Sequence, residues 1–186
     1  KICLINYPCQ DRSYFKLYNV ELAFNVEESK GQNFINVPIN IMIDAVKKSI
    51  DDKEAVWIGL DTDKFMSKKK GFYDKKGFNY LDIFGYDNTM DKCEAMNYRQ
   101  THPNHAVIIR GYNLDKGKTN GFLIENSWGK KTGFDGNYFM SLDWFKNFVF
   151  EVVVDKKCVS KKVLNVLNKK PILLPYWSPF GSLLEK

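Results

Sequence analysis

Two side chains in the second half of the chain could act together in nucleophilic catalysis. His105 begins one apolar stretch, and Asn126 ends the next one along the chain. A hairpin of these two stretches would bring its first and last residues side by side. The side-chain oxygen of Asn126 could then accept a hydrogen bond from one ring N–H of His105 and fix the tautomer. The second ring nitrogen would face a third group, so the pair predicts the base and the orienting residue of a nucleophilic triad.

Two residues that follow Asn126 fit the same hypothesis. Trp128 could cover the hydrogen bond between imidazole and amide and keep water from competing for it. Gly129 would let the backbone turn closely against the indole ring. Taken singly, His105 could be a packed residue at the start of a strand, and Asn126 a turn residue. Their conjunction in one hairpin favours the catalytic interpretation.

The strands that would carry these residues follow from the apolar pattern. Short apolar runs without helical spacing indicate strands. They are predicted over residues 1–5, 55–60, 105–112, 121–126, 137–142 and 150–154, the last being the final strand. A turn is predicted over residues 113–120, and a polar loop over residues 27–33.

Helices are predicted at few places. The clearest is expected to have Asn36 as its N-cap and Pro38 in its first turn. Its apolar residues recur at helical spacing and are Ile39, Met42, Ile43, Val46 and Ile50. Ser160 is expected to cap a second, short helix, and residues 87–100 to contain a short helical turn. Asp143 is expected to begin a turn.

The composition is that of an ordinary folded domain. The chain has 186 residues, of which 44% are hydrophobic and 15% aromatic, enough to bury a core and to exclude disorder as the overall state. Its net charge of +6 permits an acidic partner but does not require one. No apolar run approaches the roughly 18 residues of a membrane span, so no membrane partner is expected.

The cysteine pattern does not indicate a metal site. The chain contains four cysteines, which are Cys3, Cys9, Cys93 and Cys158. They form no Cys-x-x-Cys pair, so neither a zinc site nor a thioredoxin-type motif is predicted. An even count would allow two disulfides, but a chain with its own core does not need them. We therefore interpret them as four free thiols in a reducing compartment, and expect neither a metal ion nor an organic cofactor.

One loop of the chain is strongly basic. It contains Lys68–Lys70, Lys75 and Lys76. A run of this kind is usually a solvated loop. Contact with nucleic acid is the alternative, for which Phe72 and Tyr73 would supply the interleaved aromatic rings.

Three motifs of the second half resemble papain-like cysteine peptidases. They are His105-Ala106 before a strand, Glu125-Asn126-Ser127-Trp128-Gly129, and Gly136-Asn137-Tyr138. The flanking segments are similar to the bleomycin hydrolase or aminopeptidase C family within that group. These segments are residues 1–3, 16–18, 38–39, 54–57, 151–155, 171–175 and 177–183. The resemblance covers essentially the whole chain.

The resemblance implies an α+β papain-like fold with a β-rich half that bears His105 and Asn126, flanking helices and an extended C-terminal tail. The family's nucleophilic cysteine stands in an N-terminal half, after an oxyanion-hole Gln and within Cys-Trp-x-Phe. No cysteine of this chain has that context. The pair is thus expected to work with a cysteine from a missing N-terminal half, and this chain alone to be inactive. Asn104 replaces the family's usual small hydroxyl residue, and His102 is expected to be a loop residue.

The resemblance also divides the chain into three segments. Residues 1–35 would lead from the missing half or from an oligomerisation arm. Residues 36–170 would form the catalytic half that carries the histidine and the asparagine. Residues 171–186 would form a tail directed toward the active-site cleft.

The tail is expected to select substrates. Its prolines predict an extended segment that lies along a groove and is not a core element. By resemblance, that groove is the active-site cleft, and Leu184, Glu185 and Lys186 would end near the substrate. A terminal carboxylate there could pair with a substrate's α-ammonium group. A disordered tail is the alternative.

The resemblance thus implies a cytoplasmic cysteine aminopeptidase that forms a homo-hexamer and hydrolyses peptide or amide bonds near a free amino terminus. The chain begins with Lys1 and a strand already under way, which we interpret as the C-terminal part of a longer protein. Two further hypotheses stay open. One is a non-catalytic interaction or assembly fragment, and the other is a nucleic-acid-binding module.

Overall fold

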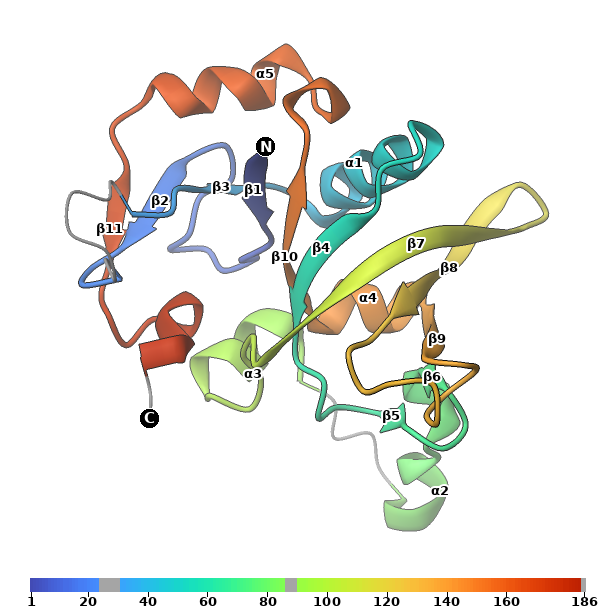
Figure 1. Ribbon diagram of the computed structural model, residues 1–186. Coiled ribbons are helices and arrows are strands. Elements are labelled where there is room, and N and C mark those ends of the chain that lie inside the picture. The colour runs from blue at the N-terminus through green and yellow to red at the C-terminus, as the bar shows by residue number, and fades with distance from the viewer. Residues whose placement is uncertain (24–30, 86–89, 185–186) are drawn as a thin grey trace.

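The computed structural model describes residues 1–23, 31–85 and 90–184, so most of the loop predicted over residues 27–33 lies outside the described residues. Within the described ranges, eleven strands form one mixed sheet in the order β11-β2-β3-β1-β10-β4-β7-β8-β9-β6-β5 (Figure 1). The strands are β1 (Ile2–Ile5), β2 (Leu17–Val20), β3 (Phe34–Asn36), β4 (Val56–Leu60), β5 (Met66–Ser67), β6 (Phe72–Tyr73), β7 (His105–Asp115), β8 (Lys118–Glu125), β9 (Asn137–Ser141), β10 (Val149–Val154) and β11 (Ile172–Leu174). All six strands predicted from the sequence are present, but β10 is not the final strand as predicted, because β11 follows it.

Short helices accompany this sheet. The α-helices are α1 (Ile39–Asp51), α2 (Tyr80–Phe84), α3 (Lys92–Asn97), α4 (Leu142–Phe148) and α5 (Lys161–Leu164). Short 3₁₀ turns are η1 (Lys75–Gly77), η2 (Lys156–Cys158), η3 (Asn165–Asn168) and η4 (Pro179–Leu184). Helix α1 packs against β4, β7 and β10, and α4 packs against β8, β9 and β10. The helical turns predicted after Ser160 and within residues 87–100 are confirmed as α5 and α3.

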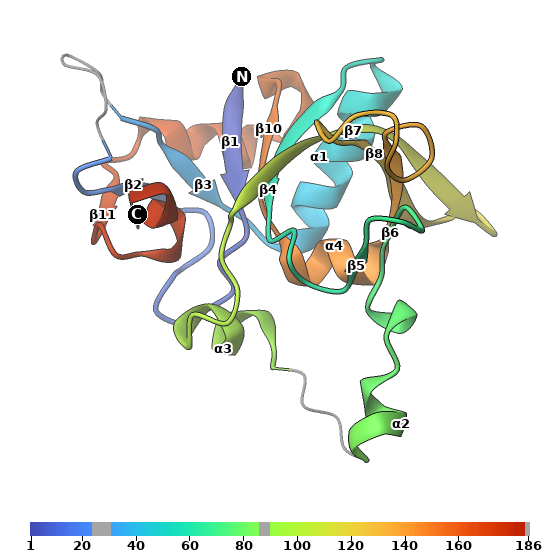
Figure 2. The same ribbon diagram turned by 60° about the horizontal axis from the view of Figure 1, so that its bottom comes forward.

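The centre of the sheet is buried on both faces. Along β1, Ile2 and Leu4 join the main core, whereas Cys3 and Ile5 join a smaller cluster with β2, β3 and β11. This alternation is what a strand imposes on successive side chains. The strand pairs antiparallel with β10 and parallel with β3. Strand β1 therefore joins the part of the sheet formed by β11, β2 and β3 to the part that begins with β10 and β4 (Figures 1 and 2).

The predicted helix is confirmed as α1, but its predicted cap is wrong. Asn36 ends β3, and Pro38 is the residue that precedes the helix. The buried Asn36 side chain donates to the carbonyl oxygens of Tyr7 (3.0 Å) and Arg12 (2.8 Å) and accepts from the Tyr7 N–H (2.9 Å). Backbone groups of the loop after β1 thus satisfy this amide, which cannot serve the helix as well.

The hairpin β7–β8 is longer than predicted. Its strands continue through most of the turn predicted over residues 113–120, and Asp115 pairs with Lys118. The two residues between them, Lys116 and Gly117, have φ of 47° and 78°. Positive φ at both central positions is typical of the tight turns whose twist matches that of a hairpin.

The turn predicted at Asp143 is instead helix α4. The Ser141 hydroxyl accepts from the N–H of Trp144 (3.3 Å) and caps the first turn. The Trp144 ring is fully buried, and its Nε1–H donates to the carbonyl oxygen of Lys64 (2.7 Å). Burial of the large apolar residues at helical spacing outweighs the turn signal of a single aspartate.

The expectation that the tail is not a core element is wrong. Strand β11 adds to the sheet edge in parallel with β2, and Leu174 is buried. Further along, the Phe180 ring lies 5.3 Å from that of Tyr7 and 5.9 Å from that of Phe34, measured between centroids. The tail therefore contributes both main-chain pairing and core contacts.

Two of the four cysteines are not free thiols, which corrects the expectation from the sequence. Cys9 and Cys93 form a disulfide with a Cα–Cα distance of 5.2 Å, while Cys3 and Cys158 are free and buried. The bond joins the loop after β1 to α3 across a sequence separation of 84 residues. Spacing along the chain carries no information on such a contact.

Reduction of this disulfide should lower the melting temperature of the protein. Closing a loop of this length raises the free energy of the unfolded chain by about 4.5 kcal/mol. The double variant Cys9→Ser/Cys93→Ser should melt at the temperature of the reduced wild type and should not respond to reductant. Melting curves with and without a phosphine reductant test this, with thiol alkylation and mass spectrometry to prove cleavage. An unchanged melting temperature after proven cleavage would contradict it.

Candidate active site

The structure brings His105 and Asn126 into contact, as predicted. His105 is the first residue of β7 and pairs with Leu60 of β4, and Asn126 directly follows β8. The Nε2 atom of His105 lies 2.9 Å from Oδ1 of Asn126. Asn126 is almost fully buried, whereas His105 is partly exposed. The hairpin therefore supports the imidazole from inside the protein and leaves part of the ring accessible.

Hydrogen bonds around Asn126 identify the protonated nitrogen of the imidazole. Oδ1 of Asn126 also accepts from the backbone N–H of Ser127 (2.8 Å). A backbone N–H can only donate, so this contact fixes which end of the amide is oxygen. The oxygen cannot donate to His105, and therefore Nε2 of the neutral ring carries the proton. Nδ1 is then the basic nitrogen, and it has no hydrogen-bond partner among the described residues.

Trp128 lies over His105, as predicted. The two ring centroids are 5.3 Å apart with an interplanar angle of 23°, a stacked arrangement. Tyr138 supports the indole edge-on at 5.9 Å. Nζ of Lys68 lies 4.6 Å from the centre of the indole ring, within the range of a cation–π contact. The indole is thus held between the imidazole and two other side chains.

The backbone conformation of Gly129 favours glycine at this position. Its φ is 82°, in the left-handed region that side chains disfavour. A Cβ atom at Gly129 would meet nothing within 4 Å apart from its neighbours in sequence. Backbone conformation, and not a close approach to more distant groups, accounts for glycine at this position.

Sequence reasoning missed the residues behind Asn126. The buried Tyr73 hydroxyl accepts from Nδ2 of Asn126 (3.3 Å) and also contacts Oγ1 of Thr62 (3.0 Å). Burial raises the pKa of Tyr73 to about 12. Asn104, which precedes His105, accepts from the N–H of Thr62 and donates to Asp61. No sequence signal links Tyr73 to this site, because it stands in the basic loop, 53 residues before Asn126 in the sequence.

The basic loop does not have the form expected of a nucleic-acid site. Tyr73 is fully buried, so it offers no face for a base to stack on. Lys68 lies against Trp128, and Lys75 lines a pocket. The structure therefore gives less support to nucleic-acid binding than the sequence does, because Tyr73 is not available for stacking.

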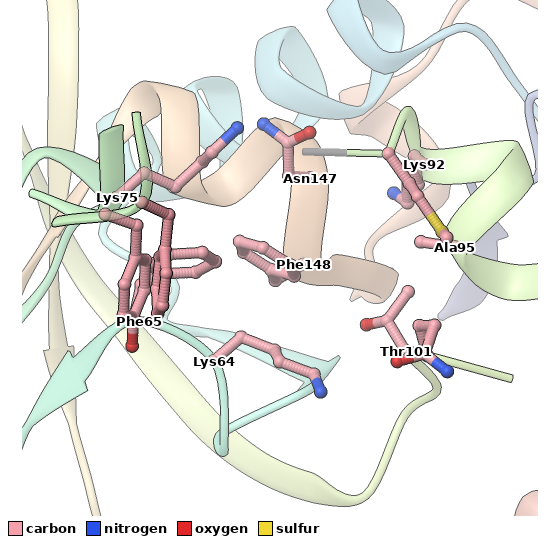
Figure 3. A pocket seen from close by; sticks show the side chains of 12 residues that line it. Lys64, Phe65, Lys75, Lys92, Ala95, Thr101, Asn147 and Phe148 are labelled. Atoms are coloured by element: carbon pink, nitrogen blue, oxygen red, sulfur yellow. The ribbon is translucent and has the colours of Figure 1, made fainter. Parts of the chain in front are cut away.

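This pocket, of about 520 Å³, does not include His105 or Asn126 in its walls (Figure 3). It is lined by Lys64, Phe65, Lys75, Tyr80, Phe84, Met90, Lys92, Ala95, Gln100, Thr101, Asn147 and Phe148. Phe65 and Phe148 face its interior between the lysine side chains (Figure 3). Lys92 is buried, and its Nζ donates to Oδ1 of Asn6 (3.0 Å) and to the carbonyl oxygen of Val149 (2.6 Å).

None of the cysteines is an accessible nucleophile. Two form the disulfide, and the other two are buried. Burial raises the pKa of the Cys3 thiol well above its usual value, which disfavours the reactive thiolate. Among the described residues no group of three or more His, Cys, Asp and Glu side chains could hold a metal ion, and no helix is long and apolar enough to cross a membrane.

The other predicted site residues have different outcomes. His102 lies outside any helix or strand, as expected. Leu184 is the last residue of η4, and Glu185 and Lys186 lie outside the described residues. The role of these last residues in substrate selection stays a prediction.

Lys92 should make stability depend on pH. Burial lowers its pKa from 10.5 to about 7, so between these values the unfolded chain binds the proton and the folded chain does not. The wild type should therefore gain stability as pH rises through this window, and lose it as pH falls toward 7. Lys92→Met removes this proton difference.

Urea unfolding of both proteins from pH 7 to about 9.5 tests this prediction. The free energy of unfolding of the wild type should rise relative to that of the variant, by about 3 kcal/mol over this range. If the difference in free energy of unfolding between the two proteins stays constant with pH, Lys92 is not held neutral.

Comparison with known proteins connects this geometry to a family. Residues 1–181 match the model of the Peptidase C1-like family. Bleomycin hydrolase from Homo sapiens is 36% identical over 189 residues, covering 100% of this chain and 42% of that protein. Aminopeptidase C from Listeria monocytogenes is 34% identical over 182 residues, covering 98% of this chain and 41% of that protein.

A solved structure is similar over the same length. The crystal structure of PepW from Lactobacillus rhamnosis HN001 matches with a TM-score of 0.93 and 32% identity, covering 96% of this chain and 41% of that chain. This chain therefore spans about two fifths of the relatives that it matches. The α+β fold predicted for it, of the papain-like cysteine peptidase type, is confirmed. Because the family model covers nearly all of its residues, the chain belongs to the Peptidase C1-like family.

Proposed function

We propose that this chain supplies the base and the orienting residue of a cysteine aminopeptidase whose nucleophile stands in an N-terminal half. The observation that carries the proposal is the hydrogen bond from His105 Nε2 to Asn126 Oδ1, which leaves Nδ1 available under Trp128. Relatives named aminopeptidase C and bleomycin hydrolase support it. The absence of an accessible thiol among the four cysteines agrees with a nucleophile from elsewhere.

The geometry supports a definite sequence of proton transfers. Nδ1 of His105 would take the proton of the cysteine thiol, giving a thiolate and an imidazolium. The thiolate would attack the substrate carbonyl carbon, and the imidazolium would protonate the leaving amine as the C–N bond breaks. Water would then attack the resulting thioester while His105 accepts one of its protons. The C–S bond breaks, the acid is released, and the imidazolium returns the proton to the departing thiolate, which restores the free thiol.

Asn126 serves the reaction by holding the ring. Its oxygen accepts from Nε2–H throughout, both before and after Nδ1 gains its proton. Because Asn126 is almost fully buried and Trp128 stacks on the imidazole, water has little access to compete for this bond. The imidazole keeps one direction and does not rotate away from the nucleophile.

Substitution of His105 should abolish turnover in the full-length protein that carries both halves. Loss of a general base costs about 10²–10⁴-fold, and here the same residue also activates the nucleophile. His102→Ala should retain most activity, because His102 lies outside the hairpin that holds the pair. Asn126→Ala should be milder than His105→Ala, because base and nucleophile both remain. Values of kcat/KM for an aminoacyl amide test this, with the 186-residue chain as the inactive reference. Equal losses for the two histidine variants would contradict the assignment.

The tail would restrict this activity to substrates with a free amino terminus. In this proposal the C-terminal carboxylate lies in the cleft and pairs with the substrate's α-ammonium group. The pairing of β11 with β2 and the packing of Phe180 on Tyr7 and Phe34 support it, because they anchor the tail before its end. A fixed anchor is what a selecting chain end requires.

Deletion of Leu183 to Lys186 from the full-length protein should therefore raise the cleavage of N-terminally blocked peptides relative to free ones. The deletion spares Phe180 and Gly181, so the anchor of the tail stays in place. Rates with matched blocked and unblocked peptides measure the ratio. A truncated enzyme that still requires a free amino terminus would show that the tail is not the selector.

Assembly as a homo-hexamer and a cytoplasmic location belong to the same proposal by family resemblance. The Cys9–Cys93 disulfide counts against a reducing compartment, since such bonds persist mainly in oxidising ones.

A non-catalytic assembly fragment is the remaining alternative. The upstream coding sequence separates the two, because a Gln followed by Cys-Trp would identify the enzyme. No observation on the described residues favours nucleic-acid binding.

A further inference from the structure

We propose that Tyr73 is a positioning residue for the catalytic pair, because its buried hydroxyl holds the amide of Asn126 in the orientation that makes His105 a base. The inference rests on the proposed function of that pair. Tyr73 touches neither His105 nor any place where a substrate would bind, so it would act only through Asn126. Its contribution comes from β6, a part of the chain that the His and Asn motifs do not include.

The hydrogen bonds around Tyr73, together with one covalent link, form a closed path that we call the hydrogen-bond ring. Nδ2 of Asn126 donates to the Tyr73 hydroxyl (3.3 Å), which contacts Oγ1 of Thr62 (3.0 Å). The backbone N–H of Thr62 donates to Oδ1 of Asn104 (2.9 Å), and Asn104 is covalently joined to His105. His105 returns to Asn126 through Nε2 (2.9 Å). The ring connects both members of the catalytic pair to β6 and to the loop that follows β4.

The amide of Asn126 assigns one role to the Tyr73 hydroxyl. Nδ2 of Asn126 can only donate, so the Tyr73 oxygen accepts there. The phenolic hydrogen is then free for Oγ1 of Thr62, which can accept it. Burial raises the pKa of Tyr73 to about 12, so the phenol keeps that hydrogen at any working pH. Each polar group in this part of the ring has a partner of the right kind.

Packing makes Tyr73 a rigid support. Its ring is fully buried and lies edge-on to Trp144 (4.9 Å) and to Tyr138 (5.7 Å), measured between centroids. Strand β6 pairs with β9, which places Met140 opposite Tyr73. A hydroxyl on so constrained a ring cannot follow the amide if the amide rotates.

The orientation of the amide decides the chemistry of the imidazole. If Asn126 rotated by half a turn, Nδ2 would face Nε2 of His105, and the ring would have to carry its proton on Nδ1. His105 could then not accept the proton of a nucleophile at Nδ1. Two contacts oppose this rotation, one at each end of the amide: the Ser127 N–H at the oxygen and Tyr73 at the nitrogen.

Tyr138 provides a matched control within the same cluster. It is also fully buried and packs against Tyr73, but its hydroxyl has no hydrogen-bond partner among the described residues. Tyr73→Phe and Tyr138→Phe therefore remove the same atom from neighbouring rings. Only the first removes a contact to Asn126.

The direct test is the tautomer of His105 in the 186-residue chain, which contains only two histidines. Nitrogen NMR of the ring-labelled protein distinguishes the two protonated positions, and His102 is the internal reference. Tyr73→Phe should raise the share of the Nδ1–H form at His105 and speed solvent exchange of Nε2–H by about tenfold, the effect of one lost hydrogen bond. Tyr138→Phe should leave both unchanged.

Kinetics of the full-length protein provide the second test. Tyr73→Phe should lower kcat by about tenfold with little change in KM, because no substrate contact is lost. Thr62→Val should lower kcat by a smaller factor. Thr62→Ser keeps the hydroxyl group and should have the kcat of the wild type. If Tyr73→Phe destabilises the fold, the two Thr62 variants decide the question.

Two results would overturn the inference. One is a tautomer and exchange rate of His105 in Tyr73→Phe that match those in Tyr138→Phe. The other is equal kcat for these two variants. Neither result would affect the proposed function, which fails if His105→Ala remains active or if His102→Ala loses as much activity. Conversely, an active His105→Ala enzyme would leave the tautomer measurement valid as a test of what Tyr73 does to the amide.

Discussion

A single oxygen atom accepts the two hydrogen bonds on which the arrangement of the site depends. Oδ1 of Asn126 receives the Ser127 N–H and His105 Nε2–H, at 2.8 and 2.9 Å. The first contact identifies the oxygen, and the second then assigns the ring proton. The elements around this atom keep it in place: β7 and β8 bring the residues together, and Tyr73 of β6 with Thr62, from the loop after β4, closes the hydrogen-bond ring behind them. An inward-facing amide of this kind needs such support, because a buried polar group without partners is costly.

The local features of the site could be predicted from the sequence, because a hairpin makes residues near in sequence near in space. The contact between His105 and Asn126 and the position of Trp128 depend only on pairing within β7–β8. Tyr73 could not be predicted in the same way, since the parallel pairing of β6 with β9 has no local signal. The disulfide and the pairing of β11 with β2 were missed for the same reason. In α4, burial of Trp144 outweighed a turn signal that was real but weak.

Helix α3 shows how distant parts of the chain meet near the site. It precedes the loop that leads to His105, and its own Asp91 cap closes its first turn. Two contacts attach it to other parts of the chain: Cys93 is bonded to Cys9, and the Lys92 amine donates to Asn6 and to the carbonyl oxygen of Val149. A buried amine with a pKa of about 7 is an unusual anchor, since desolvation disfavours its charge. Its two hydrogen bonds to neutral oxygens suit an uncharged donor.

The β7–β8 hairpin offers a place to attach a probe. Its tip, at Lys116 and Gly117, is exposed, and a Cβ atom at Gly117 would meet nothing within 4 Å. At about 3.4 Å per residue, the strand from His105 to Asp115 carries the tip roughly 30 Å away from the imidazole. A fluorophore or a short epitope inserted between Lys116 and Gly117 would thus label the protein without touching the residues at the base of the hairpin.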